Sequence, residues 1–74
     1  MSTYYFDTQD GVPVRDRTGK DLASTGAAIE HSKQIASAMR NRSEPVNKDL
    51  SVVVLDETGR EVHREPVYPA GTNP

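Results

Sequence analysis

Apolar residues follow a helical period over one long stretch of the chain, from Ala23 to Arg42. Small and apolar side chains recur there three and four positions apart, at Ala28, Ser32, Ile35, Ala36 and Met39. The opposite side of the same helical wheel is polar. This pattern predicts one amphipathic helix, which begins at Ser24 or Thr25 because either hydroxyl can cap the first turn. The small residues of the stripe favour close packing against a sheet.

Two strand patterns precede this helix. Residues 3–8 (T-Y-Y-F-D-T) are rich in aromatic and β-branched residues, and alternation places Tyr4 and Phe6 toward the core. An Asp-Gly pair then predicts a tight turn, after which residues 12–15 return as a short edge strand that contains a proline. Residues 16–20 predict a second turn, which leads toward the helix.

Two further strand patterns follow the helix. Residues 50–55 are apolar on both faces, which is typical of a central strand, and residues 60–67 return after a turn at 56–59. The whole pattern predicts an α+β fold of order ββαββ, an antiparallel four-stranded sheet with one α-helix packed on one face. We expect a single domain over residues 1–68 and a loose tail over 69–74.

Two of the predicted turns share the pattern D-x-T-G followed by a basic residue, at Asp16 to Lys20 and at Asp56 to Arg60. Aspartate side chains accept hydrogen bonds from turn amides, and glycine adopts positive φ without strain. We interpret the repetition as shared turn chemistry. An old duplication is the alternative.

Composition and charge narrow the class of protein. The chain has 74 residues, 34% of them hydrophobic, and no cysteine, which excludes disulfides and thiolate metal sites and fits a reducing compartment. Its net charge is −2 with both signs interspersed, so it lacks the positive field of non-specific nucleic-acid or anionic-membrane binders. It has no signal-peptide pattern and no apolar run near the roughly 20 residues that span a bilayer. We expect a soluble cytoplasmic domain.

Several motifs together resemble a known family: T-Y-Y-F-D-T-Q-D-G at the start, then L-A-S-T-G-A-A, then S-V-V-V-L-D-E-T-G-R-E-V. Over residues 3–67 the chain is similar to a family of short uncharacterised bacterial domains. Members of that family read R-Y-F-F-x-x-x-D-G, D-x-x-G-x-x-L, an Ala-rich helix and V-x-D-x-x-G-R-x-V. The chain departs from that pattern at Thr3, His63 and Glu65. The family has no assigned activity, so the resemblance implies a fold and no catalytic residues.

No motif in the chain predicts catalysis, a metal site or a cofactor. His31 and His63 are the only histidines, and neither lies in a metal-binding spacing such as H-x-x-x-H. Ser32 follows His31 on the helix, so their side chains point about 100° apart and cannot form a relay. We expect the Ser32 hydroxyl to bond to the carbonyl of Ala28 and the protein to be no enzyme.

The sheet face that the helix leaves uncovered is the candidate functional surface. We expect it to carry Tyr5, Val53, Leu55 and His63, more apolar surface than a solvated face needs. This predicts a protein-interaction or regulatory module with an unknown protein partner, or a homodimer that pairs through this face or a strand edge. The alternative is single-stranded nucleic-acid binding, with Tyr5 as a stacking platform and arginines along the rim. A monomer with a partly apolar surface fits the same pattern.

Overall fold

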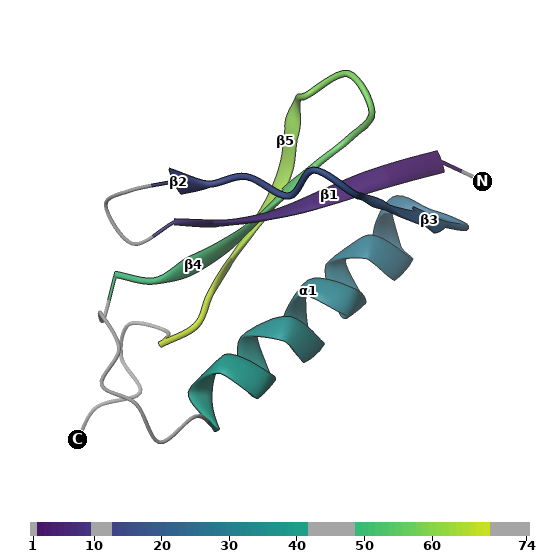
Figure 1. Cartoon of the computed structure of the whole chain (residues 1–74). Helices are drawn as coiled ribbons and strands as arrows, with labels where there is room; N and C mark the ends of the chain where they lie inside the picture. Colours follow the sequence, from purple (N-terminus) through teal and green to yellow (C-terminus); the bar gives the residue numbers. More distant parts are fainter. Residues whose placement is uncertain (1, 10–12, 42–48, 69–74) are drawn as a thin grey trace.

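The computed structural model describes residues 2–9, 13–41 and 49–68, which form an antiparallel sheet with one helix across one face (Figure 1). The elements in chain order are β1 (Ser2–Gln9), β2 (Pro13–Val14), β3 (Lys20–Leu22), α1 (Thr25–Arg40), β4 (Ser51–Leu55) and β5 (Glu61–Pro66). The predicted α+β class is therefore confirmed. The predicted Asp-Gly turn and the tail over 69–74 lie outside the described residues.

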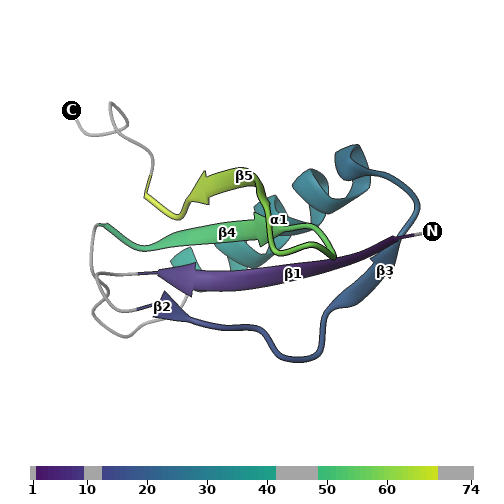
Figure 2. The ribbon, with the colours of Figure 1, turned by 90° about the horizontal axis from the view of Figure 1, so that it is seen from above.

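The long strand β1 joins the two halves of the sheet. β4 pairs with one edge of β1, and β5 pairs with the far side of β4. The other edge of β1 is shared, because β2 pairs with its end and β3 pairs with its beginning. Figure 2 shows β2 and β3 following one another along β1, with the chain between them bowed away from it.

The strand β3 corrects the four-strand prediction. The sequence pattern assigns residues 16–20 to a turn and residues 21–23 to a helix lead-in, but Lys20–Leu22 pairs with Ser2–Tyr4. This three-residue segment carries two charged side chains and has no apolar alternation that would indicate a strand. It pairs because β1, at eight residues, is long enough to bind two short segments along one edge.

Both ends of α1 are tied to the sheet. Ser24 is the N-cap, and its side chain accepts a hydrogen bond from an amide of the first turn, as predicted. At the next residue, the first of α1, the hydroxyls of Thr25 and Tyr4 lie 3.0 Å apart. At the other end, Nη1 of Arg40 donates to the carbonyl of Val67 at 2.8 Å. These contacts set the direction in which α1 crosses the sheet.

The core lies between α1 and the helix-facing side of the sheet. Its fully buried side chains come from small helix residues, from alternate positions of β4 and from the residue after β5: Ala28, Ser32, Ala36, Val52, Val54 and Val67. Phe6 packs against both parts of this core. The buried Ser32 hydroxyl donates to the carbonyl of Ile29 at 2.6 Å, so the predicted bond to Ala28 is wrong by one residue. Small helix side chains thus bring α1 close to β4.

Gly19 and Gly59 provide a matched pair of substitutions. Both have positive φ, +74° and +86°. A Cβ on Gly19 would lie 2.8 Å from Cγ2 of Thr3 and 2.9 Å from the Tyr5 ring, whereas a Cβ on Gly59 meets nothing within 4 Å. We expect Gly59→Ala to cost about 1 to 2 kcal/mol from backbone strain alone. Gly19→Ala should cost about 2 to 4 kcal/mol, because overpacking adds to the strain.

Urea denaturation of both variants measures this difference. Equal losses of unfolding free energy in the two variants would show that the turn at Gly19 does not pack against β1 as described.

Candidate interaction surface

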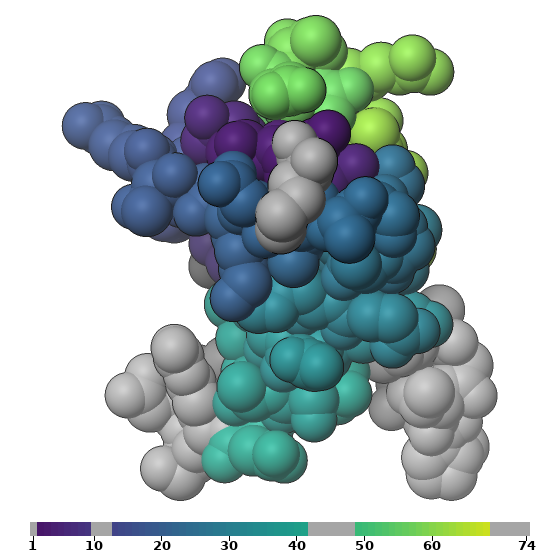
Figure 3. Space-filling model, turned by 90° about the vertical axis from the view of Figure 1, so that its right-hand side faces the viewer, coloured from purple at the N-terminus to yellow at the C-terminus, as the bar shows by residue number. Residues whose placement is uncertain are grey.

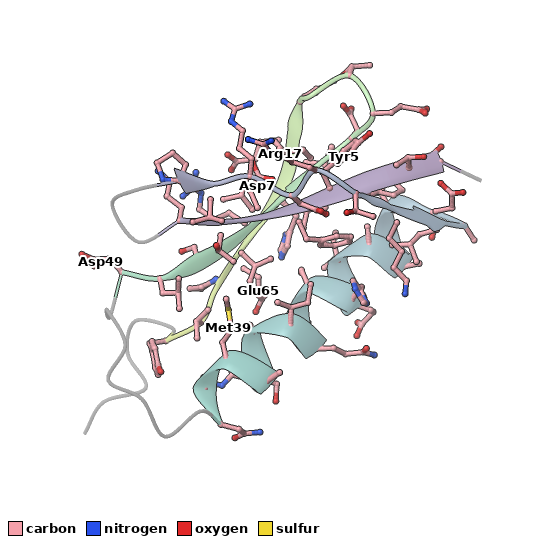
Figure 4. All side chains as sticks on the ribbon, in the orientation of Figure 1. Tyr5, Asp7, Arg17, Met39, Asp49 and Glu65 are labelled. Carbon is pink, nitrogen blue, oxygen red and sulfur yellow. The ribbon has the colours of Figure 1, made fainter. Side chains whose placement is uncertain are left out.

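The pairing register decides which side chains lie on the face away from α1, called here the open face. Directly opposite residues in an antiparallel pair project from the same side of the sheet. Tyr5 opposes Leu55, and Val53 opposes both Asp7 and Arg64. These five residues therefore share the open face, and Figure 4 shows Tyr5 and Asp7 on the side of the sheet away from α1.

Val53 is covered, contrary to the prediction that it is part of an exposed apolar surface. It is only 6% exposed, and its neighbour Asp7 is 9% exposed. Arg64 on β5 donates to Oε1 of Gln9 on β1 at 3.2 Å, so its side chain reaches across β4. The same guanidinium donates to both carboxylate oxygens of Glu61 at 3.1 and 3.3 Å. A polar bridge thus lies over the apolar strand that was expected to be open.

His63 lies on the helix side of the sheet, so its predicted place on the open face is wrong. It opposes Val54, and its Nε2 lies 2.9 Å from Oε1 of Glu65, which Figure 4 shows on the same side as α1. The cause is an irregularity in register between Val54 and Leu55. Simple alternation sends His63 outward because Val62 packs on the core, but the inserted residue keeps both on one side.

A cavity of about 330 Å³ opens on this face. Its floor includes Tyr5 and Leu55, which are half-buried, and the D-x-T-G turns lie on its two sides. Figure 3 shows the β2–β3 connection (blue) projecting to the left of β1 and the β4–β5 turn (green) rising above it. The complete lining is Tyr5, Asp7, Arg15, Asp16, Leu55, Asp56, Glu57, Thr58 and Gly59.

The first turn is held to β1 by the side chain of Asp16. Its Oδ1 accepts from the amides of Thr18 and Gly19 at 3.0 and 3.3 Å. Its Oδ2 accepts from the amide of Phe6 at 3.1 Å, so the carboxylate replaces the strand carbonyl that is missing between β2 and β3. In return, Oδ1 of Asp7 accepts from the amide of Asp16 at 2.8 Å. Sequence analysis identified the turn but not these bonds to β1.

The second turn is capped in the same way. Oδ1 of Asp56 accepts from the amides of Thr58 and Arg60 at 2.9 and 3.0 Å and from the Thr58 hydroxyl at 2.6 Å. The carbonyl of Asp56 also accepts from the amide of Gly59 at 2.9 Å. The two D-x-T-G motifs therefore do share turn chemistry, and the fold brings them to opposite sides of one cavity.

The hydrogen bonds keep both turn aspartates ionised. Burial alone would raise the pKa of Asp16, but the amides of Thr18, Phe6 and Gly19 outweigh it and lower that pKa. The hydroxyl of Thr58 is the main cause that lowers the pKa of Asp56. Four of the lining residues are acidic and only Arg15 is basic, so the cavity disfavours anions.

The edges of the sheet are poorly suited to pairing with another chain. β5 contains Pro66, carries charged side chains and begins beside an irregularity in register. On the opposite side, β2 and β3 have two and three residues, and β2 contains Pro13. Proline, charge and short strands are the usual means of protecting an edge. The hypothesis of a homodimer through a strand edge is therefore disfavoured. The open face remains as the candidate interaction surface.

His31 lies on the other side of the sheet from this cavity. Its ring meets the helix-facing Phe6 edge to face, with centroids 4.8 Å apart. Burial, with the positive charge of Lys20, lowers the pKa of His31, which favours the neutral ring. Within residues 2–9, 13–41 and 49–68, no group of three or more His, Asp or Glu side chains is arranged to hold a metal ion.

The described residues form a small α+β domain with a helix on one face of its sheet and a polar cavity on the other. A family model described as a domain of unknown function (DUF6894) matches residues 3–68. The chain belongs to that family, which confirms the resemblance seen in its motifs. No curated protein and no solved structure matches the chain. None of the described helices is long and apolar enough to cross a membrane.

Asp16 should make the fold sensitive to acid. Its pKa in the folded state is lowered from the ordinary value of 3.8. A depressed folded-state pKa contributes stability that is fully present above about pH 4 and is lost as pH falls through the folded-state pKa. We expect Asp16→Asn to be less stable than the natural chain at pH 7 and to lose less stability between pH 4 and pH 2.

Urea denaturation from pH 7 to pH 2 measures this effect. The matched control is Glu57→Gln, which neutralises an exposed carboxylate that makes no hydrogen bond within the described residues. An acid dependence in Asp16→Asn equal to that of the natural chain would contradict the role assigned to this carboxylate.

Proposed function

We propose that this protein is a non-enzymatic interaction module that binds another protein through its open face. The observation that carries the proposal is the cavity floored by Tyr5 and Leu55, on a sheet face that no described element covers. A half-buried apolar floor with a polar rim resembles the make-up of protein interfaces, where an apolar centre is surrounded by charged groups. The protected edges of the sheet leave this face as the better candidate.

The distribution of reactive side chains supports a non-enzymatic role. His31 and Ser32 belong to α1, on the side of the sheet away from the cavity. The hydroxyl of Ser32 is fully buried and already donates to a backbone carbonyl. The cavity lining offers carboxylates, one arginine and a tyrosine, without a nucleophile beside a histidine base.

The alternative, single-stranded nucleic-acid binding, has less support. Tyr5 does lie on the open face, where a base could stack on it. The carboxylates that surround it would repel a phosphate backbone, and Arg64 is engaged by Glu61 and Gln9. Titration of a labelled single-stranded oligonucleotide at low salt tests this alternative, and salt-sensitive binding there would favour it over a protein partner.

Leu55→Gln should abolish capture of the protein partner. The change places a polar amide on the cavity floor, which should cost the fold about 1 kcal/mol of stability. The same change at the centre of an interface should weaken binding by more than that. The matched control is Val14→Gln, because Val14 is 62% exposed and does not line the cavity. The measurement is affinity capture from the native cell with the natural chain and both variants immobilised.

Proteins retained by the natural chain and by Val14→Gln, but lost with Leu55→Gln, support the proposal. Equal retention by all three chains counts against the open face, provided that circular dichroism shows all three folded.

A further inference from the structure

We infer that the open face binds a second copy of this chain, in a dimer whose two-fold axis runs parallel to β1. Arg17 of each copy then lies against Glu57 of the other. This inference rests on the proposed function, since it names the partner of the same face.

The two flanks of the cavity carry opposite charges. The β2–β3 connection presents Arg15 and Arg17, both exposed, and the ionised Asp16 between them leaves this connection net positive. The β4–β5 turn presents the carboxylates of Asp56 and Glu57, and Arg60 at its end leaves that turn net negative. Within the ranges that the structure describes, Arg17 and Glu57 make no hydrogen bond or ion pair. Each flank therefore presents a charge that its own copy does not neutralise.

A two-fold axis parallel to β1 brings these flanks together. Half a turn about such an axis, lying in the plane of the interface, exchanges the two sides of β1. The basic flank of one copy then faces the acidic flank of its partner, and the same contact occurs twice. An axis in the same plane but perpendicular to β1 would set like charges against each other. Charge complementarity thus selects one of the two symmetric arrangements.

The shape of the open face agrees with this arrangement. The β4–β5 turn stands above the sheet on the side away from α1, whereas the β2–β3 connection extends beside β1 (Figures 1 and 3). In the dimer, the raised turn of one copy lies along the lower flank of the other. Tyr5 and Leu55 are then at the centre, where two copies exclude water from the half-buried apolar floor.

The size of the face sets the strength of the contact. The open face spans a small sheet, and Val53 at its middle is already covered by Arg64. We therefore expect the contact to bury less than the roughly 1,200 Å² that stable complexes bury. We expect a transient dimer with a Kd of about 0.1 to 1 mM, weakened by salt.

Charge reversal at the two positions tests the dimer. Sedimentation of the natural chain from about 20 μM to about 2 mM at low salt should show a reversible dimer. Arg17→Glu and Glu57→Arg should each raise its Kd at least about tenfold, because each creates two like-charge contacts. Both substitutions in one chain restore opposite charges and should return the Kd to within about threefold of the natural value.

The control is Lys33→Glu, which makes the same change of charge as Arg17→Glu but on an exposed position of α1. A monomer at every concentration overturns the inference. An equal change of the dimer Kd in Arg17→Glu and in Lys33→Glu also overturns it. A double reversal that fails to restore the Kd does the same. Folding of each variant is checked by circular dichroism.

The same variants separate this inference from the proposed function. A chain that stays monomeric, while Leu55→Gln still abolishes capture of a different protein, overturns self-pairing and leaves the interaction module supported.

Discussion

The structure depends on how the second edge of β1 is filled. β4 pairs with five consecutive residues along one edge, but the other edge is divided between β2 and β3. A gap between two short strands would leave a strand amide without a partner, which is costly wherever water is excluded. The carboxylate of Asp16 fills this gap by accepting from the amide of Phe6, and Asp7 anchors the turn in return. One side chain thus supplies a partner for the strand amide that lies in the gap.

This solution also creates the cavity. Because a side chain makes the bond, the main chain of residues 15–19 runs further from β1 than a paired strand does. The β4–β5 turn approaches from the other side, since Leu55 opposes Tyr5 and the chain turns directly after it. Tyr5 therefore lies between two turns of like construction. The gap in the sheet and the candidate surface have the same physical origin.

Much of the fold could be predicted from periodicity alone. The helix, its Ser24 cap and the central strand follow from patterns that repeat along one element. The missed features depend on partners far away in the sequence. Lys20–Leu22 becomes a strand only because β1 offers a free edge, and His63 changes side through one irregularity in register. Of the predicted surface, Tyr5 and Leu55 do line the cavity, while Val53 is hidden by an arginine from the next strand.

The cover over Val53 also determines what kind of recognition this face supports. Within the part of the chain that the structure describes, one helix covers one face of the sheet and no second layer of secondary structure covers the open face. Arg64 supplies part of that layer, because its side chain reaches across β4 while its guanidinium bonds to Gln9 and Glu61. The apolar area left open is therefore small and is confined to the cavity floor. A partner of this face gains little from burying apolar surface, so charge and shape at the two turns must decide which partner binds.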